Sequence, residues 1–298
     1  MIGALWAVAA GIGFGVFQTV NRRAVRDLDV YIATFVQLVV SAFVLIIISL
    51  ATQDLNLLYN APATAWLYFG LAGFVHFFIG WTFLNASQKQ VGAARTSSLI
   101  ATIPLFGIAL AAATLGELPS WLMIGGMGVI IGGVYLVNQA RIQQNEATAK
   151  LPTGWRSLIA GLMAALCWSV SPIFIRFGLA ELAAPILGLT VGISASVLGY
   201  GVVVFVRRLK TIPVRFPTEA LVIKVIAGVL AALATWAYWV AFDLASVALV
   251  LTLSLLSVPT VNLLSPWLVG RELEQVTAQV WLGSGLIIGG SVLLIFLR

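Results

Sequence analysis

Two stretches decide the fold: residues 101–117, ATIPLFGIALAAATLGE, and residues 256–272, LSVPTVNLLSPWLVGRE. In the first, Pro104 precedes Glu117 by thirteen residues, and in the second Pro259 precedes Glu272 by the same distance. Both pairs are related by an offset of 155 residues. A proline and an acidic residue at one spacing in two apolar segments indicate an internal repeat, which is the first feature to settle in any sequence.

The match extends on both sides of these stretches. Upstream, three residues have counterparts in the second half: Arg22 and Arg176, Trp81 and Trp236, Ala86 and Ala241. Downstream, glycines recur in the next apolar segment at an offset of 157, as Gly126 and Gly133 against Gly283 and Gly290. The second copy therefore has a turn two residues longer. We interpret the chain as a tandem duplication.

The composition predicts that most of the surface faces lipid. Of the 298 residues 61% are hydrophobic and 9% are charged, whereas a soluble domain carries about 25% charged residues. A membrane-spanning helix needs about 20 apolar residues, and backbone without access to water must be helical. The apolar runs divide into ten predicted spans, approximately residues 2–20, 30–51, 65–85, 91–115, 120–137, 156–176, 184–206, 219–242, 246–268 and 276–297.

The predicted fold class is an all-α membrane protein with ten transmembrane helices in two inverted five-helix repeats. Because each repeat has an odd number of spans, the second half enters the membrane from the opposite side. The predicted units are a first repeat over 1–137, a polar linker over 138–154 and a second repeat over 155–298. The first run lacks a basic leading segment, so we interpret it as a retained span and not a cleaved signal peptide.

The basic residues predict an orientation. Fourteen of them fall in one set of loops: Arg22, Arg23, Arg26, Lys89, Arg95, Arg141, Lys150, Arg156, Arg207, Arg208, Lys210, Arg215, Lys224 and Arg271. The opposite set holds only Arg176 and Arg298. Since Lys and Arg accumulate in cytoplasmic loops, we expect the linker in the cytoplasm and both termini outside. The same distribution explains the net charge of +6 without a nucleic-acid partner.

The chain resembles the drug/metabolite transporter superfamily, in its ten-span branch of two EamA-type repeats. The resemblance rests on three features: an aromatic residue followed after seven residues by a basic one (Phe14 and Arg22, Trp168 and Arg176), the proline-to-glutamate spacing, and the paired glycines. It covers nearly the whole chain and implies a central cavity lined by spans 1, 3, 4, 6, 8 and 9. Family members are usually drawn with cytoplasmic termini, so the charge distribution and the resemblance predict opposite orientations. We follow the charges.

The two repeated prolines are predicted to act as hinges. Pro104 and Pro259 lie about midway along the fourth and ninth predicted spans, where each removes a backbone hydrogen bond. A static kink is the alternative. Repetition of the position in both copies favours a flexing point used in alternating access.

Substrate-binding candidates are aromatic and polar residues away from span ends. The tryptophans are Trp81, Trp168, Trp236 and Trp239, with helix packing as the alternative. Trp236 and Trp239 share a helix face that ends in Asp243, one turn further on. His76, the only histidine, lies near the centre of span three, where a titratable group indicates a site. A neutral imidazole bonded to a neighbouring helix is the alternative there. We expect His76, Trp236 and Trp239 to face one cavity.

Further candidates are polar or basic. Gln18 and Asn85 are predicted to supply polar contacts to the substrate. Arg22 and Arg176 end spans on opposite membrane faces and are predicted to attract a carboxylate at the two mouths of the pathway, with solvated edge positions as the alternative.

What is missing from the sequence limits the chemistry. All ten acidic residues fall in loops or near span ends, so the sequence predicts no mid-span carboxylate to bind protons or cationic drugs. It shows no cluster of Cys and His for a metal, no phosphate-binding glycine loop, and only one histidine for catalysis. We therefore expect no enzyme activity, no cofactor and no metal. The single cysteine, Cys167, excludes an internal disulfide.

These observations predict a secondary transporter of a small amphipathic metabolite, an amino acid or a related compound. We expect alternating access around a central cavity, with export favoured over import because the resembling branch is known mostly for efflux. The alternatives are a sugar or nucleotide-sugar transporter of the same fold, and a non-transporting scaffold or lipid-processing enzyme. The expected partners are the small-molecule substrate and the lipid bilayer. The protein is predicted to be multi-pass in the cell (inner) membrane and monomeric, with a homodimer as the alternative.

Overall fold

The computed structural model describes residues 1–25, 27–148, 156–209, 217–268 and 277–296, and over these ranges it contains helices and no β-strand. The helices are α1 (Ile2–Val25), α2 (Val30–Thr52), α3 (Asn56–Tyr59), α4 (Ala63–Gly73), the π-helix η1 (Phe74–Gly80), α5 (Trp81–Ile100), α6 (Ile103–Leu115), α7 (Trp121–Thr148), α8 (Arg156–Glu181), α9 (Pro185–Leu209), α10 (Thr218–Leu244), α11 (Val247–Leu253), the 3-10 helix η2 (Ser254–Leu256), α12 (Ser257–Leu268) and α13 (Ala278–Phe296). The predicted all-α membrane fold is confirmed.

Eight helices in the described ranges are long and apolar enough to cross a membrane, and two further apolar helices, Ile103–Leu115 and Trp121–Val137, are shorter. Each of the ten predicted spans overlaps one of these helices, the fourth only over Ile103–Leu115. The inverted relation between the two halves and the boundaries of the repeats remain predictions.

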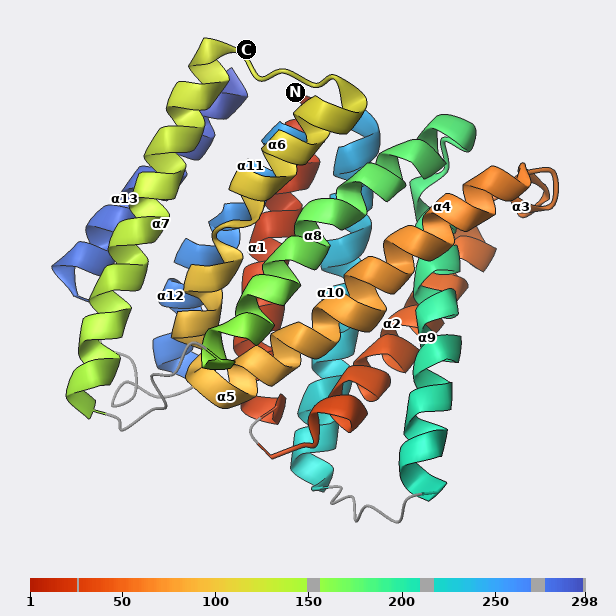
Figure 1. The fold of residues 1–298 in the computed structure, drawn as a ribbon, viewed down its shortest axis with the longest axis horizontal. Coiled ribbons are helices and arrows are strands. Elements are labelled where there is room, and N and C mark those ends of the chain that lie inside the picture. Colours follow the sequence, from red (N-terminus) through yellow and green to blue (C-terminus); the bar gives the residue numbers. More distant parts are fainter. Residues whose placement is uncertain (26, 149–155, 210–216, 269–276, 297–298) are drawn as a thin grey trace.

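The helices form a bundle with a central pair and two outer pairs. α1 packs along α10 in the middle, α7 lies beside α13 at one edge, and α2 lies beside α9 at the other (Figure 1). α4, η1 and α5 cross the bundle together with α8 between these edges. The N-terminus and the end of α13 lie at the same end of the bundle (Figure 1).

Small residues allow the helices to approach closely. A Cβ added to Gly133 of α7 would lie 2.6 Å from the carbonyl oxygen of Gly283 of α13, and a Cβ on Gly283 would lie 2.5 Å from the carbonyl oxygen of Gly133. Both glycines belong to the repeated set, so the duplicated position brings one copy against the other. Packing of this kind replaces the hydrophobic driving force that is absent within a bilayer.

Three boundaries differ from the predictions. Residues 86–90, expected to connect spans three and four, are helical within α5. α7 continues to Thr148, so most of the predicted linker is helix, because its Ala, Arg, Gln and Glu residues are good helix formers. The fourth predicted span is interrupted at residues 101–102, ahead of α6. The rest of the linker and Glu272 lie outside the described residues.

Candidate functional site

A cavity lies where α1, η1, α8 and α10 meet the two interrupted helices. Its walls are mainly aromatic and apolar, with a few uncharged polar groups and one histidine. The lining residues are Phe14, Phe17, Gln18, His76, Trp81, Ile100, Ile103, Trp168, Tyr238, Ser254, Leu255 and Ser257. Both halves of the chain contribute to it, and no Asp, Glu, Lys or Arg is among these lining residues. Ligand sites in proteins are commonly concave, apolar spaces with few polar groups.

Both interrupted helices border the cavity. One interruption, at residues 101–102, separates α5 from α6, and the other is η2 between α11 and α12. Pro104 and Pro259 therefore lie in the first turns of α6 and α12, which corrects the expectation that they interrupt continuous helices midway. A proline is well tolerated in a first turn, because its missing N–H has no partner to lose there.

Each proline also withholds one backbone donor. A proline offers no N–H to the carbonyl four residues before it. These carbonyls belong to Ile100 and Leu255, and both residues line the cavity. The repeated prolines thus place two backbone breaks, one from each half, beside the same space.

His76 lies inside η1, whose i→i+5 bonding gives wider turns than an α-helix. Its ring is buried, with Nδ1 2.9 Å from Ser171 Oγ of α8. The Trp168 indole lies 5.7 Å from this ring, and its Nε1 donates to the His76 carbonyl oxygen at 3.1 Å. α8 therefore holds η1 through both the ring and the backbone of His76. Such π segments occur frequently at functional sites.

Trp81 and Gln18 complete this side of the cavity. The Trp81 indole is buried between the rings of Phe17 and Phe77, at centroid distances of 6.3 Å and 5.0 Å. Gln18 lines the cavity from α1 and is the only amide side chain among the lining residues. Thus four predicted site residues, Gln18, His76, Trp81 and Trp168, meet at one space.

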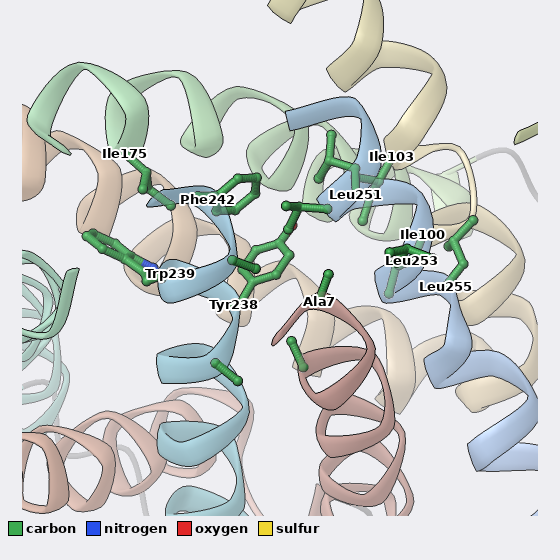
Figure 2. Packing of buried hydrophobic residues seen from close by; sticks show 14 of the residues in the cluster. Ala7, Ile100, Ile103, Ile175, Tyr238, Trp239, Phe242, Leu251, Leu253 and Leu255 are labelled. Carbon is green, nitrogen blue, oxygen red and sulfur yellow. The ribbon is translucent and has the colours of Figure 1, made fainter. Parts of the chain in front are cut away.

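The structure does not bring Trp236 and Trp239 to this cavity. Trp239 is fully buried with its ring 5.9 Å from that of Phe69, and Trp236 packs against Trp6 at 6.1 Å. Figure 2 shows Trp239 on the side of α10 toward Ile175, while Tyr238 lies on another side of the helix. Tyr238 is the residue of α10 that lines the cavity. Sequence reasoning missed it by ranking ring size above the direction in which each residue points.

Asn85 belongs to a separate polar cluster. Its Nδ2 donates to Thr34 Oγ1 at 2.8 Å, and its Oδ1 accepts from Asn21 Nδ2 at 3.1 Å. Lys224 of α10 is part of the same cluster and is completely buried. The sequence analysis counted Lys224 as a loop residue, which is wrong, because α10 begins six residues earlier at Thr218.

The two arginines lie near helix ends, outside the cavity lining. Arg176 of α8 donates from Nη1 to the Phe242 carbonyl oxygen at 2.7 Å, and its Nη2 lies 3.4 Å from Glu117 Oε1. The other oxygen of Glu117 accepts the backbone N–H of Val247, the first residue of α11, at 2.7 Å. Arg22 lies near the end of α1 with a half-buried side chain. In the described ranges no group of three or more His, Cys, Asp or Glu residues is arranged to hold a metal.

The chain is similar to known proteins in sequence and in fold. Residues 1–139 match the model of the EamA-like transporter family. The first half of the chain is thus similar to EamA-like transporter domains. The resemblance to the drug/metabolite transporter superfamily inferred from the repeated motifs is confirmed.

Two further similarities agree with this assignment. Over 133 residues the chain is 27% identical to YyaM, an uncharacterized transporter of Bacillus subtilis (strain 168). That match spans 44% of this chain and 43% of the relative, less than half of its length. A solved crystal structure shares the fold over 97% of this chain and 99% of its own, with a TM-score of 0.71 and 16% identity. The fold of nearly the whole chain is therefore shared with a solved structure.

Proposed function

We propose that the protein is a secondary transporter that moves a small, uncharged or zwitterionic amphipathic metabolite by alternating access through the central cavity. An amino acid or a related compound fits this description. We further propose export as the direction and the cell (inner) membrane as the location. The observation that carries the proposal is the aromatic cavity, built from both halves of an EamA-like chain between two interrupted helices.

The cavity walls support this substrate class. Aromatic rings offer flat apolar surface, and each stacked ring contributes about 0.5–1.5 kcal/mol beyond its buried area. His76, Tyr238, Ser254 and Ser257 add polar groups at a few points. A strongly charged solute would meet no opposite charge among the lining residues, and desolvating an unpaired charge is costly. A sugar transporter would be expected to present more amides and carboxylates than the single amide of Gln18.

The interrupted helices support alternating access. In transporters, binding sites near the bilayer midplane are formed by discontinuous helices, and the two halves rock against each other. Here both breaks lie beside the cavity at positions related by the duplication. A short non-helical or 3-10 segment can change direction with little loss of hydrogen bonding, so α6 and α12 can each swing about these points.

The experiment begins with purified protein and a panel of metabolites in a thermal-shift assay, because a ligand of the native state raises the unfolding temperature. Hits are then tested as radiolabelled solutes in proteoliposomes. Phe17→Leu and Trp168→Phe are expected to raise KM about two- to tenfold, the equivalent of one lost aromatic contact. Trp281→Phe is the matched control, since Trp281 is exposed on α13 away from the cavity.

Two outcomes would contradict the proposal. If no metabolite of the panel binds or crosses the membrane with the protein present, a non-transporting scaffold is the better description. If a solute is transported but Phe17→Leu and Trp168→Phe behave like Trp281→Phe, the transport pathway lies elsewhere in the bundle.

A further inference from the structure

The most unusual buried group outside the cavity is the amine of Lys224. The side chain is fully buried in α10, and its Nζ donates to Asn21 Oδ1 of α1 and, at 2.6 Å, to Gln37 Oε1 of α2. Both acceptors are themselves buried amides. Ionisable side chains within membrane spans are costly and commonly mark ion or substrate pathways.

A network of uncharged groups surrounds the amine. Asn21 Nδ2 donates to Asn85 Oδ1 at 3.1 Å and to Gln88 Oε1 at 3.0 Å, both on α5. Asn85 in turn donates to Thr34 Oγ1 of α2. The cluster of Lys224, Asn21, Gln37, Asn85, Gln88 and Thr34, called here the lysine cluster, therefore joins α1, α2 and α5 of the first half to α10 of the second.

The number of acceptors matches a neutral amine. Lys224 makes two hydrogen bonds, one to each amide oxygen. A neutral amine has two N–H donors and a lone pair, whereas an ammonium has three donors and no acceptor. The observed arrangement satisfies the neutral form completely and leaves one donor of the charged form without an acceptor among the described residues.

No described carboxylate fixes a proton on Lys224, because those nearby have other partners. Glu219 of α10 pairs with Arg23 of α1 at 2.6 Å, and the Asp29 carboxylate that caps α2 lies 3.5 Å from Arg207 of α9. The remaining titratable groups of the neighbouring helices are also placed. They are Arg22 of α1, Tyr31 of α2 under the Arg207 guanidinium, Lys89 of α5 bonded to the Leu28 carbonyl, Tyr200 of α9 against Thr82, and Arg176 of α8 against Glu117.

The lysine cluster adjoins the cavity along two helices. On α1, Asn21 follows the cavity residue Gln18 by three positions, and on α5 Asn85 follows Trp81 by four. Residues three or four apart lie on the same face of a helix, one turn from each other. A change in the lysine cluster is therefore transmitted directly to two walls of the cavity.

We propose that Lys224 is a proton-binding site that couples proton movement to the opening of the cavity. The amine takes a proton from hydronium to give an ammonium and water, and the reverse step returns it, with no bond to the solute. Binding the proton creates a third N–H donor, so the ammonium favours a conformation in which the helices part to admit water or another acceptor. The proton is thus bound preferentially by one conformation, which is the requirement for coupling. This inference rests on the proposed transport function.

Cavity access can be measured without any solute. In a Cys167→Ala background, Ser257→Cys places a thiol of nearly the same size in the cavity lining, and Ser120→Cys places one in the exposed loop before α7. Rates of reaction with N-ethylmaleimide are measured on purified protein between about pH 6 and about pH 9, a range in which Asp, Glu and Tyr side chains of ordinary pKa do not change charge. Because burial raises the pKa of a thiol, each rate is first divided by the thiolate fraction of that cysteine, taken from its own pH titration, and the ratio of the two corrected rates is then compared.

With Lys224 present, the ratio of rates is expected to rise severalfold as the pH falls. Lys224→Gln keeps two N–H donors but cannot take up a proton, and its ratio should stay at the high-pH value. Lys224→Arg carries a permanent charge and should stay at the low-pH value. Folding of each variant is checked by size-exclusion chromatography. If Lys224→Gln does not fold, loss of the pH dependence in Lys224→Arg alone decides.

A flat ratio in the parent protein, or a pH dependence that survives in a folded Lys224 variant, would overturn the proton site. These outcomes are separate from those of the transport assay. Solute flux with a flat labelling ratio would remove the proton site and leave the transporter. A Lys224-dependent labelling ratio in a protein that moves no solute would remove the transport function and leave a proton-sensitive cavity.

Discussion

At the scale of single residues, charged side chains in this bundle link the ends and faces of different helices. Glu117 illustrates this, since one oxygen accepts the N–H of Val247 at the start of α11 and the other lies near Arg176. The sequence analysis placed Glu117, with the other acidic residues, in loops or near span ends. Its bond to α11, 130 positions further along the chain, depends on the packed fold and has no local signal.

Glu117→Gln is expected to lower the unfolding temperature of the purified protein. The amide keeps an oxygen for Val247 but loses the charge that favours a helix N-terminus and pairs with Arg176, a change worth about 0.5–2 kcal/mol. The matched control is Glu219→Gln, because Glu219 pairs with Arg23 while both side chains are mostly exposed. An exposed pair contributes about 0–1 kcal/mol. Equal shifts in the two variants would show that Glu117 does not secure α11.

Lys224 and Tyr238 show what residue-level reasoning can and cannot recover. Lys224 lies six positions inside α10 and also inside the predicted span over 219–242, yet the sequence analysis grouped it with the basic loop residues. Tyr238 and Trp239 are neighbours, and only the rotation of α10 within the bundle decides which of them reaches the cavity. His76, Trp81 and Trp168 were found because large or titratable side chains at mid-span are costly unless they face protein or water.

At the scale of elements, the π-helix η1 depends on close packing below it. Gly73, the last residue of α4, lies against the backbone of Gly192 on α9. This contact allows α4 and α9 to touch immediately before η1 begins. The wider turns of η1 have no signature in the sequence of Phe74–Gly80, whose apolar residues suit an α-helix equally well, so this segment was not predicted.

Gly73→Ala is expected to destabilise the protein by about 1–3 kcal/mol, because the added methyl overlaps the Gly192 backbone, which cannot move aside. Gly70→Ala is the control on the same helix. A Cβ at Gly70 would meet nothing within 4 Å, so this change should be neutral or slightly stabilising through the better helix propensity of alanine. Thermal unfolding of both purified variants provides the measurement, and a Gly73→Ala protein as stable as Gly70→Ala would contradict the assigned contact.

The interrupted helices lead to a prediction about motion. Pro104→Ala and Pro259→Ala should leave the protein folded, because both positions lie in first helical turns, where alanine is also well tolerated. Transport should slow in both variants, since each helix becomes harder to bend at its break. Pro62→Ala is the control, because Pro62 also precedes a helix but lies in an exposed loop.

Rates are measured in proteoliposomes and expressed per folded molecule. Reduced expression with an unchanged rate per molecule would mark Pro104 and Pro259 as packing elements, and the hinge assignment would then be withdrawn.

At the scale of the whole molecule, the duplication made the fold largely predictable. Ten apolar segments and one repeated proline–glutamate spacing were sufficient to predict an all-α membrane bundle, which is confirmed. The contacts between halves were not predictable in the same way. Gly133 of one copy touches Gly283 of the other. Such a contact follows from three-dimensional packing and cannot be read from the sequence.

The orientation of the bundle can be tested directly. Lys224 proves to be inside a helix, but thirteen basic residues still fall on the side of the linker and two on the other, so the linker is predicted to be cytoplasmic. In a Cys167→Ala background, Glu146→Cys near the end of α7 should resist an impermeant maleimide in intact cells. Ser120→Cys, in the loop at the opposite end of α7, should react readily. The reverse pattern would place the termini in the cytoplasm.

The wider turns of η1 also give the two copies of one ancestral unit unequal surfaces. Each residue of η1 advances through a smaller angle than in an α-helix, so Trp81 after it faces inward, while Trp236, its counterpart on the regular α10, faces Trp6. If the two repeats presented identical surfaces to the cavity, the steps that open a carrier inward and outward would be mirror images with equal rate constants. Unequal half-sites remove that equality without altering the equilibrium. In the proposed transporter, one irregular helix would thus give the inward-opening and outward-opening steps different rate constants.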